Sequence, residues 1–122
     1  MKVIITAGSA KVEARLNDSA TAGAIAKALP IRAKASRWGN EIYFTIPVSM
    51  PEEESASDVV PKGAIAYWPP GRALCFFFGP TPASEGDECR AASAVNVAGN
   101  IEGSLEGLGD VRDGDPVEVR TA

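Results

Sequence analysis

The sequence predicts a mainly β fold: a closed antiparallel barrel of about eight strands with one or two short helices. Three observations carry this prediction. Short segments of alternating apolar and polar residues recur along the 122 residues. Residues typical of tight turns, such as Gly39-Asn40, separate most of these segments, and one segment alone has clear helical spacing. A chain of this length is expected to form one domain, residues 1–122, without disulfide or metal support.

The first thirty residues predict a β-hairpin followed by a helix. Residues 2–6 and 10–16 alternate apolar and polar side chains, and Ala7-Gly8-Ser9 joins them. Asn17-Asp18 then supplies a helix N-cap, and apolar residues recur at helical spacing until Pro30 ends the pattern. We expect this short amphipathic helix to cover one end of the sheet.

The middle of the chain predicts a second hairpin and then a long loop. Residues 31–38 and 41–46 alternate in the same way on either side of Gly39-Asn40, a pair that accepts positive φ at low steric cost. Residues 47–62 indicate a loop, because they contain two internal prolines and the acidic run Glu52-Glu53-Glu54, which we expect to lie in solvent.

The remaining elements follow from the same signals. In order they are a strand that begins at Ile65, a turn at Pro69-Pro70-Gly71, a strand over 73–78, a polar loop over 80–94 that is not expected to pack, a strand marked by Val95, Val97 and Ile101, a weak helical turn over 104–109, and a last strand at Val117 and Val119.

The segment from Ala64 to Ser84 is the expected place for binding. It holds five of the eight aromatic residues of the chain. Strand 73–78 is apolar on both faces, so a core must cover one face and something else must cover the other. The second cover is another part of the fold, a ligand, or a partner protein such as a second copy of the chain.

Composition excludes several classes of function. The net charge is −4 and the basic residues are scattered, which argues against nucleic acid as a partner. The chain has no histidine, so Ser-His-Asp and Cys-His catalysis and most metal sites are excluded. No GxGxxG or GxxxxGK[ST] loop is present, and we expect neither a cofactor nor a metal. No apolar run spans a bilayer and no signal peptide is evident, so we expect a cytoplasmic protein without a membrane partner.

The two cysteines, Cys75 and Cys89, do not have the spacing of a zinc or redox motif. Cys75 lies inside the apolar strand and is expected to be a small core residue. Cys89 lies in a polar stretch between Glu88 and Arg90, which makes it a candidate exposed thiol.

Three blocks of the sequence, ARLNDSATAGAIAKALP (14–30), SRWGNEIYFTIPV (36–48) and KGAIAYWPPGRALCFFFGPTPAS (62–84), resemble the signature blocks of a family of small prokaryotic cyclophilin-like proteins. The resemblance implies a cyclophilin-like barrel of about eight antiparallel strands. It implies little about activity, because that family is largely uncharacterised. True cyclophilins are prolyl isomerases marked by a Phe-His-Arg-type motif. This chain has no histidine and places its candidate arginine in Ser36-Arg37-Trp38, so no catalytic residue carries over.

The candidate ligand-binding residues share aromatic character or a place beside the aromatic turns: Arg37, Trp38, Tyr43, Tyr67, Trp68, Phe76 and Thr81. Structural roles are the alternative, in which Arg37 pairs with Glu41, Trp38 fills a gap and Trp68 shields a sheet edge. The favoured function is non-catalytic binding of a small molecule or peptide. The alternatives are a prolyl isomerase in which Arg37 polarises a carbonyl, and a homodimer that buries strand 73–78. Whether the chain is an enzyme stays open.

Overall fold

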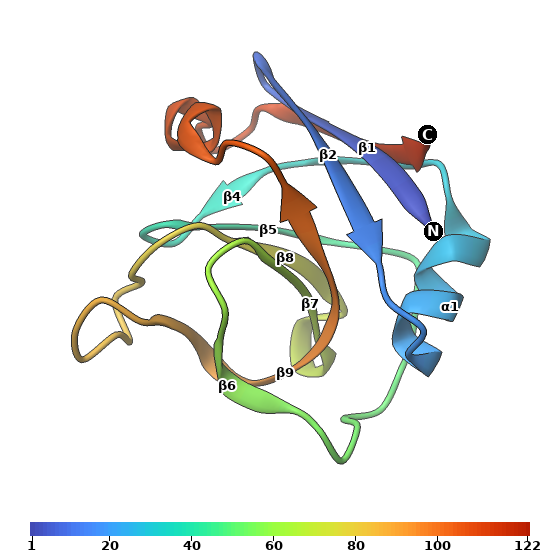
Figure 1. The fold of residues 1–122 in the computed structure, drawn as a ribbon, viewed down its shortest axis with the longest axis horizontal. Coiled ribbons are helices and arrows are strands. Elements are labelled where there is room, and N and C mark those ends of the chain that lie inside the picture. The colour runs from blue at the N-terminus through green and yellow to red at the C-terminus, as the bar shows by residue number, and fades with distance from the viewer.

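The computed structural model describes residues 1–122 and shows a strongly curved antiparallel sheet with one α-helix at its end (Figure 1). The ten strands are β1 (Lys2–Ala7), β2 (Ala10–Leu16), β3 (Ile31–Lys34), β4 (Ser36–Arg37), β5 (Glu41–Thr45), β6 (Ser57–Val60), β7 (Ala64–Trp68), β8 (Ala73–Phe77), β9 (Cys89–Glu102) and β10 (Pro116–Thr121). The helix is α1 (Ala20–Ala28), and two 3₁₀ helices span Pro69–Gly71 and Glu106–Asp110. The mainly β fold class is therefore confirmed.

The strand order is β3-β10-β1-β2-β9-β7-β8-β5-β4, with β6 paired to β9 beside this path. No hydrogen-bonded ladder joins β3 to β4, so the sheet is curved but not closed by hydrogen bonds. The two end strands are nevertheless consecutive in the chain, with Ala35 between them. The Ala35 N–H donates a 2.8 Å hydrogen bond to the Asp115 carbonyl, and the Ala35 carbonyl accepts one of 2.8 Å from the Gly114 N–H. Ala35 therefore lies between β3, which pairs with β10, and β4, which pairs with β5.

The count of about eight strands was too low, for two reasons. The single strand predicted over 31–38 is divided at Ala35 into β3 and β4. The predicted loop over 47–62 contains β6, which pairs with the first part of β9. That part of β9 starts at Cys89, inside the segment that was expected to be too polar to pack. Cys89 and Ala91 are each only 3% exposed, because every second residue there turns toward the body of the fold.

Helix α1 is capped by Ser19, one residue after the predicted cap at Asn17-Asp18. The Ser19 hydroxyl accepts a 3.1 Å hydrogen bond from the backbone N–H of Ala22. The Asn17 side chain instead accepts from the backbone N–H of Ser19, so it forms the turn that leads into the cap. The helix covers one end of the sheet, as expected (Figure 1).

One residue of the acidic run turns inward, contrary to the prediction that the run lies in solvent. The Glu53 carboxylate accepts hydrogen bonds of 3.1 Å and 2.5 Å from the backbone N–H and the hydroxyl of Thr21, in the first turn of α1. The buried Asn96 side chain accepts from the Glu53 backbone N–H and donates to Thr21 and to the Pro51 carbonyl. This network ties the 47–56 loop to the helix and to β9, and a carboxylate at a helix N-terminus is electrostatically favourable there.

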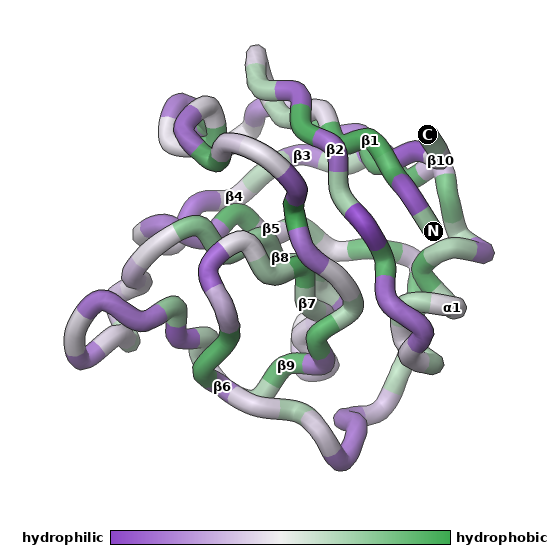
Figure 2. Tube along the Cα trace, viewed as in Figure 1, coloured by the Kyte–Doolittle hydropathy of each residue, from purple (hydrophilic) through white to green (hydrophobic).

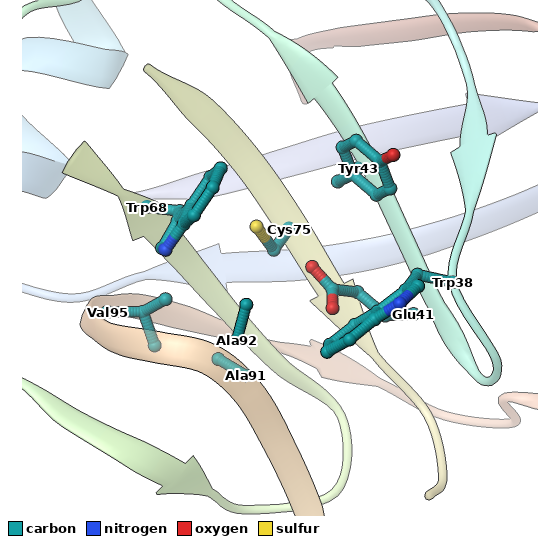
Figure 3. A pocket seen from close by; sticks show the side chains of 8 residues that line it. All are labelled: Trp38, Glu41, Tyr43, Trp68, Cys75, Ala91, Ala92 and Val95. Atoms are coloured by element: carbon teal, nitrogen blue, oxygen red, sulfur yellow. The ribbon is translucent and has the colours of Figure 1, made fainter. Parts of the chain in front are cut away.

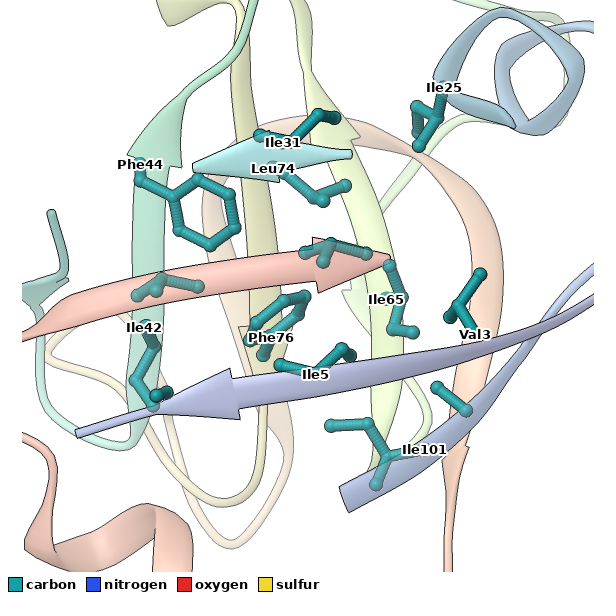
Figure 4. Packing of buried hydrophobic residues seen from close by; sticks show 14 of the residues in the cluster. Val3, Ile5, Ile25, Ile31, Ile42, Phe44, Ile65, Leu74, Phe76 and Ile101 are labelled. Atoms are coloured by element: carbon teal, nitrogen blue, oxygen red, sulfur yellow. The ribbon is translucent and has the colours of Figure 1, made fainter. Parts of the chain in front are cut away.

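Strand β8 separates two apolar clusters. Leu74 and Phe76 face the larger cluster, of 25 buried residues, where the Phe76 and Phe44 rings meet edge to face with centroids 5.4 Å apart (Figure 4). Cys75 and Phe77 face a smaller cluster of 9 buried residues. Hydrophobic residues recur along the neighbouring strands β7, β8 and β9 (Figure 2). The second cover that strand 73–78 requires is thus another part of the same chain.

No helix of the structure combines the length and apolarity that crossing a membrane requires.

Candidate functional site

The smaller cluster leaves a cavity of about 160 Å³ open over β8, which we call the Glu41 pocket (Figure 3). Most of its wall is apolar. Its lining residues are Trp38, Glu41, Tyr43, Trp68, Cys75, Ala91, Ala92 and Val95. They come from the β4–β5 turn, from β5, β7 and β8, and from the first part of β9.

The cavity exists because the residues at its floor and on its β9 wall have short side chains, which leave space between β8 and β9 unfilled. Cys75 pairs across the sheet with Tyr43 on β5 and with Ala66 on β7, so the floor is low in its centre. The wall formed by β9 carries alanines, and the three aromatic rings stand around the rim (Figure 3). The Trp68 ring is fixed there by a 2.7 Å hydrogen bond from its indole N–H to the Ser93 hydroxyl.

Glu41 is the only acidic residue that lines the pocket. It begins β5 and is only 6% exposed, and its carboxyl group points into the space between Trp38 and Cys75 (Figure 3). Its side chain takes part in no salt bridge, and no lysine or arginine lines the pocket. Burial away from water raises the pKa of Glu41 to about 7, and the neighbouring Cys75 thiol only partly offsets this by hydrogen bonding to the carboxylate.

Cys75 is the second ionisable group on the pocket floor. Burial raises the pKa of its thiol well above the ordinary value, and the nearby Glu41 carboxylate adds to the increase. A thiol held in its neutral form is a poor nucleophile and a weak hydrogen-bond donor. Cys75 therefore acts in the pocket as a small, polarisable surface rather than as a reactive group.

The Arg37 guanidinium points away from the Glu41 pocket and is held by backbone oxygens. It donates hydrogen bonds of 2.8 to 3.1 Å to the carbonyl groups of Gly39, Gly109 and Val111. Its central carbon lies 5.0 Å from the centroid of the Phe78 ring. The expected alternative, a pair with Glu41, is not formed. The physical reason is that the 3₁₀ helix Glu106–Asp110 brings unpaired carbonyl groups to Arg37, which the sequence does not reveal.

The other predicted site residues divide into two groups. Trp38, Tyr43 and Trp68 line the Glu41 pocket together. Tyr67 and Phe76 are 0% exposed on the opposite face of the sheet, where the Tyr67 hydroxyl donates a 2.7 Å hydrogen bond to the Val48 carbonyl. Thr81 is buried away from the pocket and its hydroxyl donates to the Arg90 carbonyl.

The pocket residues that the prediction missed are Glu41, Cys75, Ala91, Ala92 and Val95. For Glu41 a signal was present. It lies two positions before Tyr43 on the same strand, so strand alternation places both side chains on one face, opposite Ile42 and Phe44. The β9 residues offered no such signal, because their position depends on how far the strand curls over β8.

A second depression lies between the β4–β5 turn and the 3₁₀ helix Glu106–Asp110. It is wider, about 550 Å³, but only two of its seven lining residues, Phe78 and Leu105, are hydrophobic. Its two charged residues, Lys62 and Glu106, are both exposed, unlike the buried Glu41. The Glu41 pocket is therefore the candidate functional site.

The curved sheet, the helix at its end and the aromatic pocket define a small β protein with a barrel-like core. The sequence profile of the cyclophilin-like family matches residues 1–120, and the chain belongs to that family. The resemblance predicted from the three sequence blocks is thereby confirmed.

The solved structures that are similar to this chain include the following two. The solution structure of a hypothetical protein from Archaeoglobus fulgidus is 50% identical, with a TM-score of 0.85 over 100% of this chain and 95% of that one. The structure of McbB in complex with tryptophan is 14% identical, with a TM-score of 0.69 over 98% of this chain and 44% of that one. At 14% identity the second likeness shows the fold alone. No curated protein matches the chain.

Proposed function

We propose that this cyclophilin-like protein binds a small molecule, or one side chain of a peptide, in the Glu41 pocket. The observation that carries the proposal is an open, apolar pocket over β8 that has three aromatic side chains and one buried carboxyl group in its lining. Its volume is about 160 Å³, and its concave, mostly apolar wall with one polar group is the usual form of a small-molecule site. An apolar cavity of about 150 Å³ is large enough to bind benzene.

The lining supports binding rather than a purely structural void. Trp38, Tyr43 and Trp68 are each half-buried, so their rings are shared between the fold and the cavity. Seven of the eight lining residues are hydrophobic, and the exception, Glu41, supplies one group that fixes the orientation of an occupant. Apolar walls with few polar groups are the usual composition of a small-molecule site.

Neither alternative function gains support of this kind. An isomerase that uses Arg37 needs a free guanidinium at a pocket, whereas this guanidinium is bound by three carbonyl groups. A dimer through strand 73–78 needs an exposed apolar face, whereas β8 lies between β5 and β7 and all its residues are buried.

Ligand-observed NMR with a library of single-ring fragments tests the proposal. Ala92 is exposed at the pocket wall, so Ala92→Phe should fill the cavity without disturbing the core. Ala20→Phe, at an exposed alanine outside the pocket, is the matched control. We expect fragments to bind the wild type and Ala20→Phe and to lose binding to Ala92→Phe. Fragments that bind all three proteins equally, or that bind none, would overturn the proposal.

A further inference from the structure

The charge arrangement of the Glu41 pocket restricts the chemistry of its occupant. The groups that face the Glu41 carboxyl are, by element, Trp38 after β4, Tyr43 on β5, Trp68 at the end of β7, Cys75 on β8, and Ala91, Ala92 and Val95 on β9. None of them is cationic at neutral pH, and the thiol and the phenol are the only titratable groups among them. The nearest arginine in sequence, Arg37, is already bound by backbone carbonyl groups.

A carboxylate in this position lacks the partner that buried charges normally have. Buried carboxylates in proteins are paired with a cation or with several N–H donors, and an unpaired one is strongly disfavoured. Burial raises the pKa of the Glu41 carboxyl group to about 7, and the weakly donating Cys75 thiol only partly offsets this increase. A cationic partner would have to enter from the cavity, because no basic residue of the chain lines the pocket.

An ammonium group satisfies the pocket in two ways at once. It supplies N–H donors and positive charge to the carboxylate, and charge-assisted hydrogen bonds of this kind are the strongest that side chains form. The indole faces of Trp38 and Trp68, which stand at the rim, also attract a cation. A neutral ring would gain only apolar contact, and an anion would be repelled by Glu41.

We propose that the occupant of the Glu41 pocket is an amine, protonated to an ammonium group and carried on a single ring or a short chain. This inference rests on the binding function proposed above and specifies its ligand class. The size of the pocket, about 160 Å³, sets the limit of one ring or one lysine-length chain.

The ammonium should bind more tightly as pH rises. Glu41 must be ionised to pair with it, and its pKa is about 7 in the empty pocket. The affinity for an amine therefore increases through that pH and levels off above it, as long as the amine itself stays protonated. The affinity for a neutral ring of the same shape should not increase.

Three isosteric probes test this inference: benzylamine, benzyl alcohol and benzoate. Binding is measured by titration of the indole N–H resonances at about pH 5.5 and about pH 8, on the wild type, Glu41→Gln and the surface control Glu52→Gln. We expect benzylamine to bind the wild type at least about tenfold more tightly than benzyl alcohol at the higher pH, which corresponds to about 1.4 kcal/mol. Benzoate should not bind, and Glu41→Gln alone should lose the preference for the amine.

The outcomes separate the two proposals. If benzyl alcohol binds as tightly as benzylamine and Glu41→Gln changes nothing, the ligand class is wrong but the binding function stands. If no probe of any charge binds, both fail. Comparing butylamine with Nα-acetyl-lysine methylamide identifies the source of the amine: tighter binding of the lysine derivative indicates a peptide, and tighter binding of butylamine indicates a free small molecule.

Discussion

Glu41 should make the stability of the protein depend on pH in an unusual direction. Its carboxyl pKa is raised by burial from 4.5 to about 7 in the folded state. A raised acid pKa means that the folded state favours the protonated form, so the contribution of Glu41 to stability is fully present below about pH 4.5. The contribution declines as pH rises through the interval between the two pKa values, and it is lost above about pH 7.

The size of this effect follows from the pKa change. Each unit of pKa is worth about 1.36 kcal/mol, so a rise from 4.5 to about 7 corresponds to about 3 kcal/mol in the free energy of unfolding. This value is an upper limit, because the carboxyl group lines an open pocket and Glu41 is 6% exposed, so solvent screens part of the effect. Glu41→Gln removes the titration and keeps the shape, so its stability should lack this component.

Urea denaturation of the wild type and Glu41→Gln at several values between about pH 4.5 and about pH 8 measures the effect. The difference in unfolding free energy should move in favour of the variant by up to about 3 kcal/mol over that range. Other titrating groups, such as Glu88, are common to both proteins and cancel. Glu52→Gln, at an exposed site, should track the wild type at every pH. If the unfolding free energies of the wild type and Glu41→Gln change with pH in parallel, the Glu41 carboxyl group does not have a pKa raised by burial.

Three further predictions concern packing. Gly99→Ala should lower the free energy of unfolding by on the order of 1–3 kcal/mol, and with it the melting temperature, because a Cβ at Gly99 would overlap the backbone of β2. Gly23→Ala has open space around it in α1 and should be neutral or stabilising by calorimetry. Arg37→Lys should destabilise nearly as much as Arg37→Met, since an ammonium cannot bridge the carbonyl groups that the guanidinium joins; equal melting temperatures for Arg37→Lys and wild type would contradict this. Ellman's reagent should leave Cys75 and Cys89 unmodified in the native protein and react with both in urea, and fast native labelling of Cys89 would show that it is not buried.

The parts of the fold that the sequence predicted correctly are those encoded by neighbouring residues. The β1–β2 hairpin and the turn at Gly39-Asn40 follow from local alternation and turn chemistry, and both are formed. Strand β6 was missed because it has only four residues and its partner, β9, is distant in sequence. The division at Ala35 was missed for the same reason, since residues 114 and 115 impose it.

The candidate site shows the same limit. Aromatic character alone identified Trp38, Tyr43 and Trp68, because large rings beside rigid turns are common at binding sites. It could not tell these rings from Tyr67 and Phe76, which belong to the core on the other face. Distinguishing them requires the register between β7 and β8, and that register is set by pairing between strands rather than by either strand alone.

The two faces of strand β8 differ: one packs into the larger core, and the other forms the floor of the Glu41 pocket. Leu74 and Phe76 face the larger apolar core, and that face stabilises the structure. Cys75 faces a cavity and a carboxyl without a cation, which together reduce stability at neutral pH. A destabilising arrangement confined to one face, next to a face that is fully packed, is expected where a site is kept open for a ligand. A ligand that supplies the missing contacts should therefore raise the melting temperature of the wild type and should raise that of Glu41→Gln less.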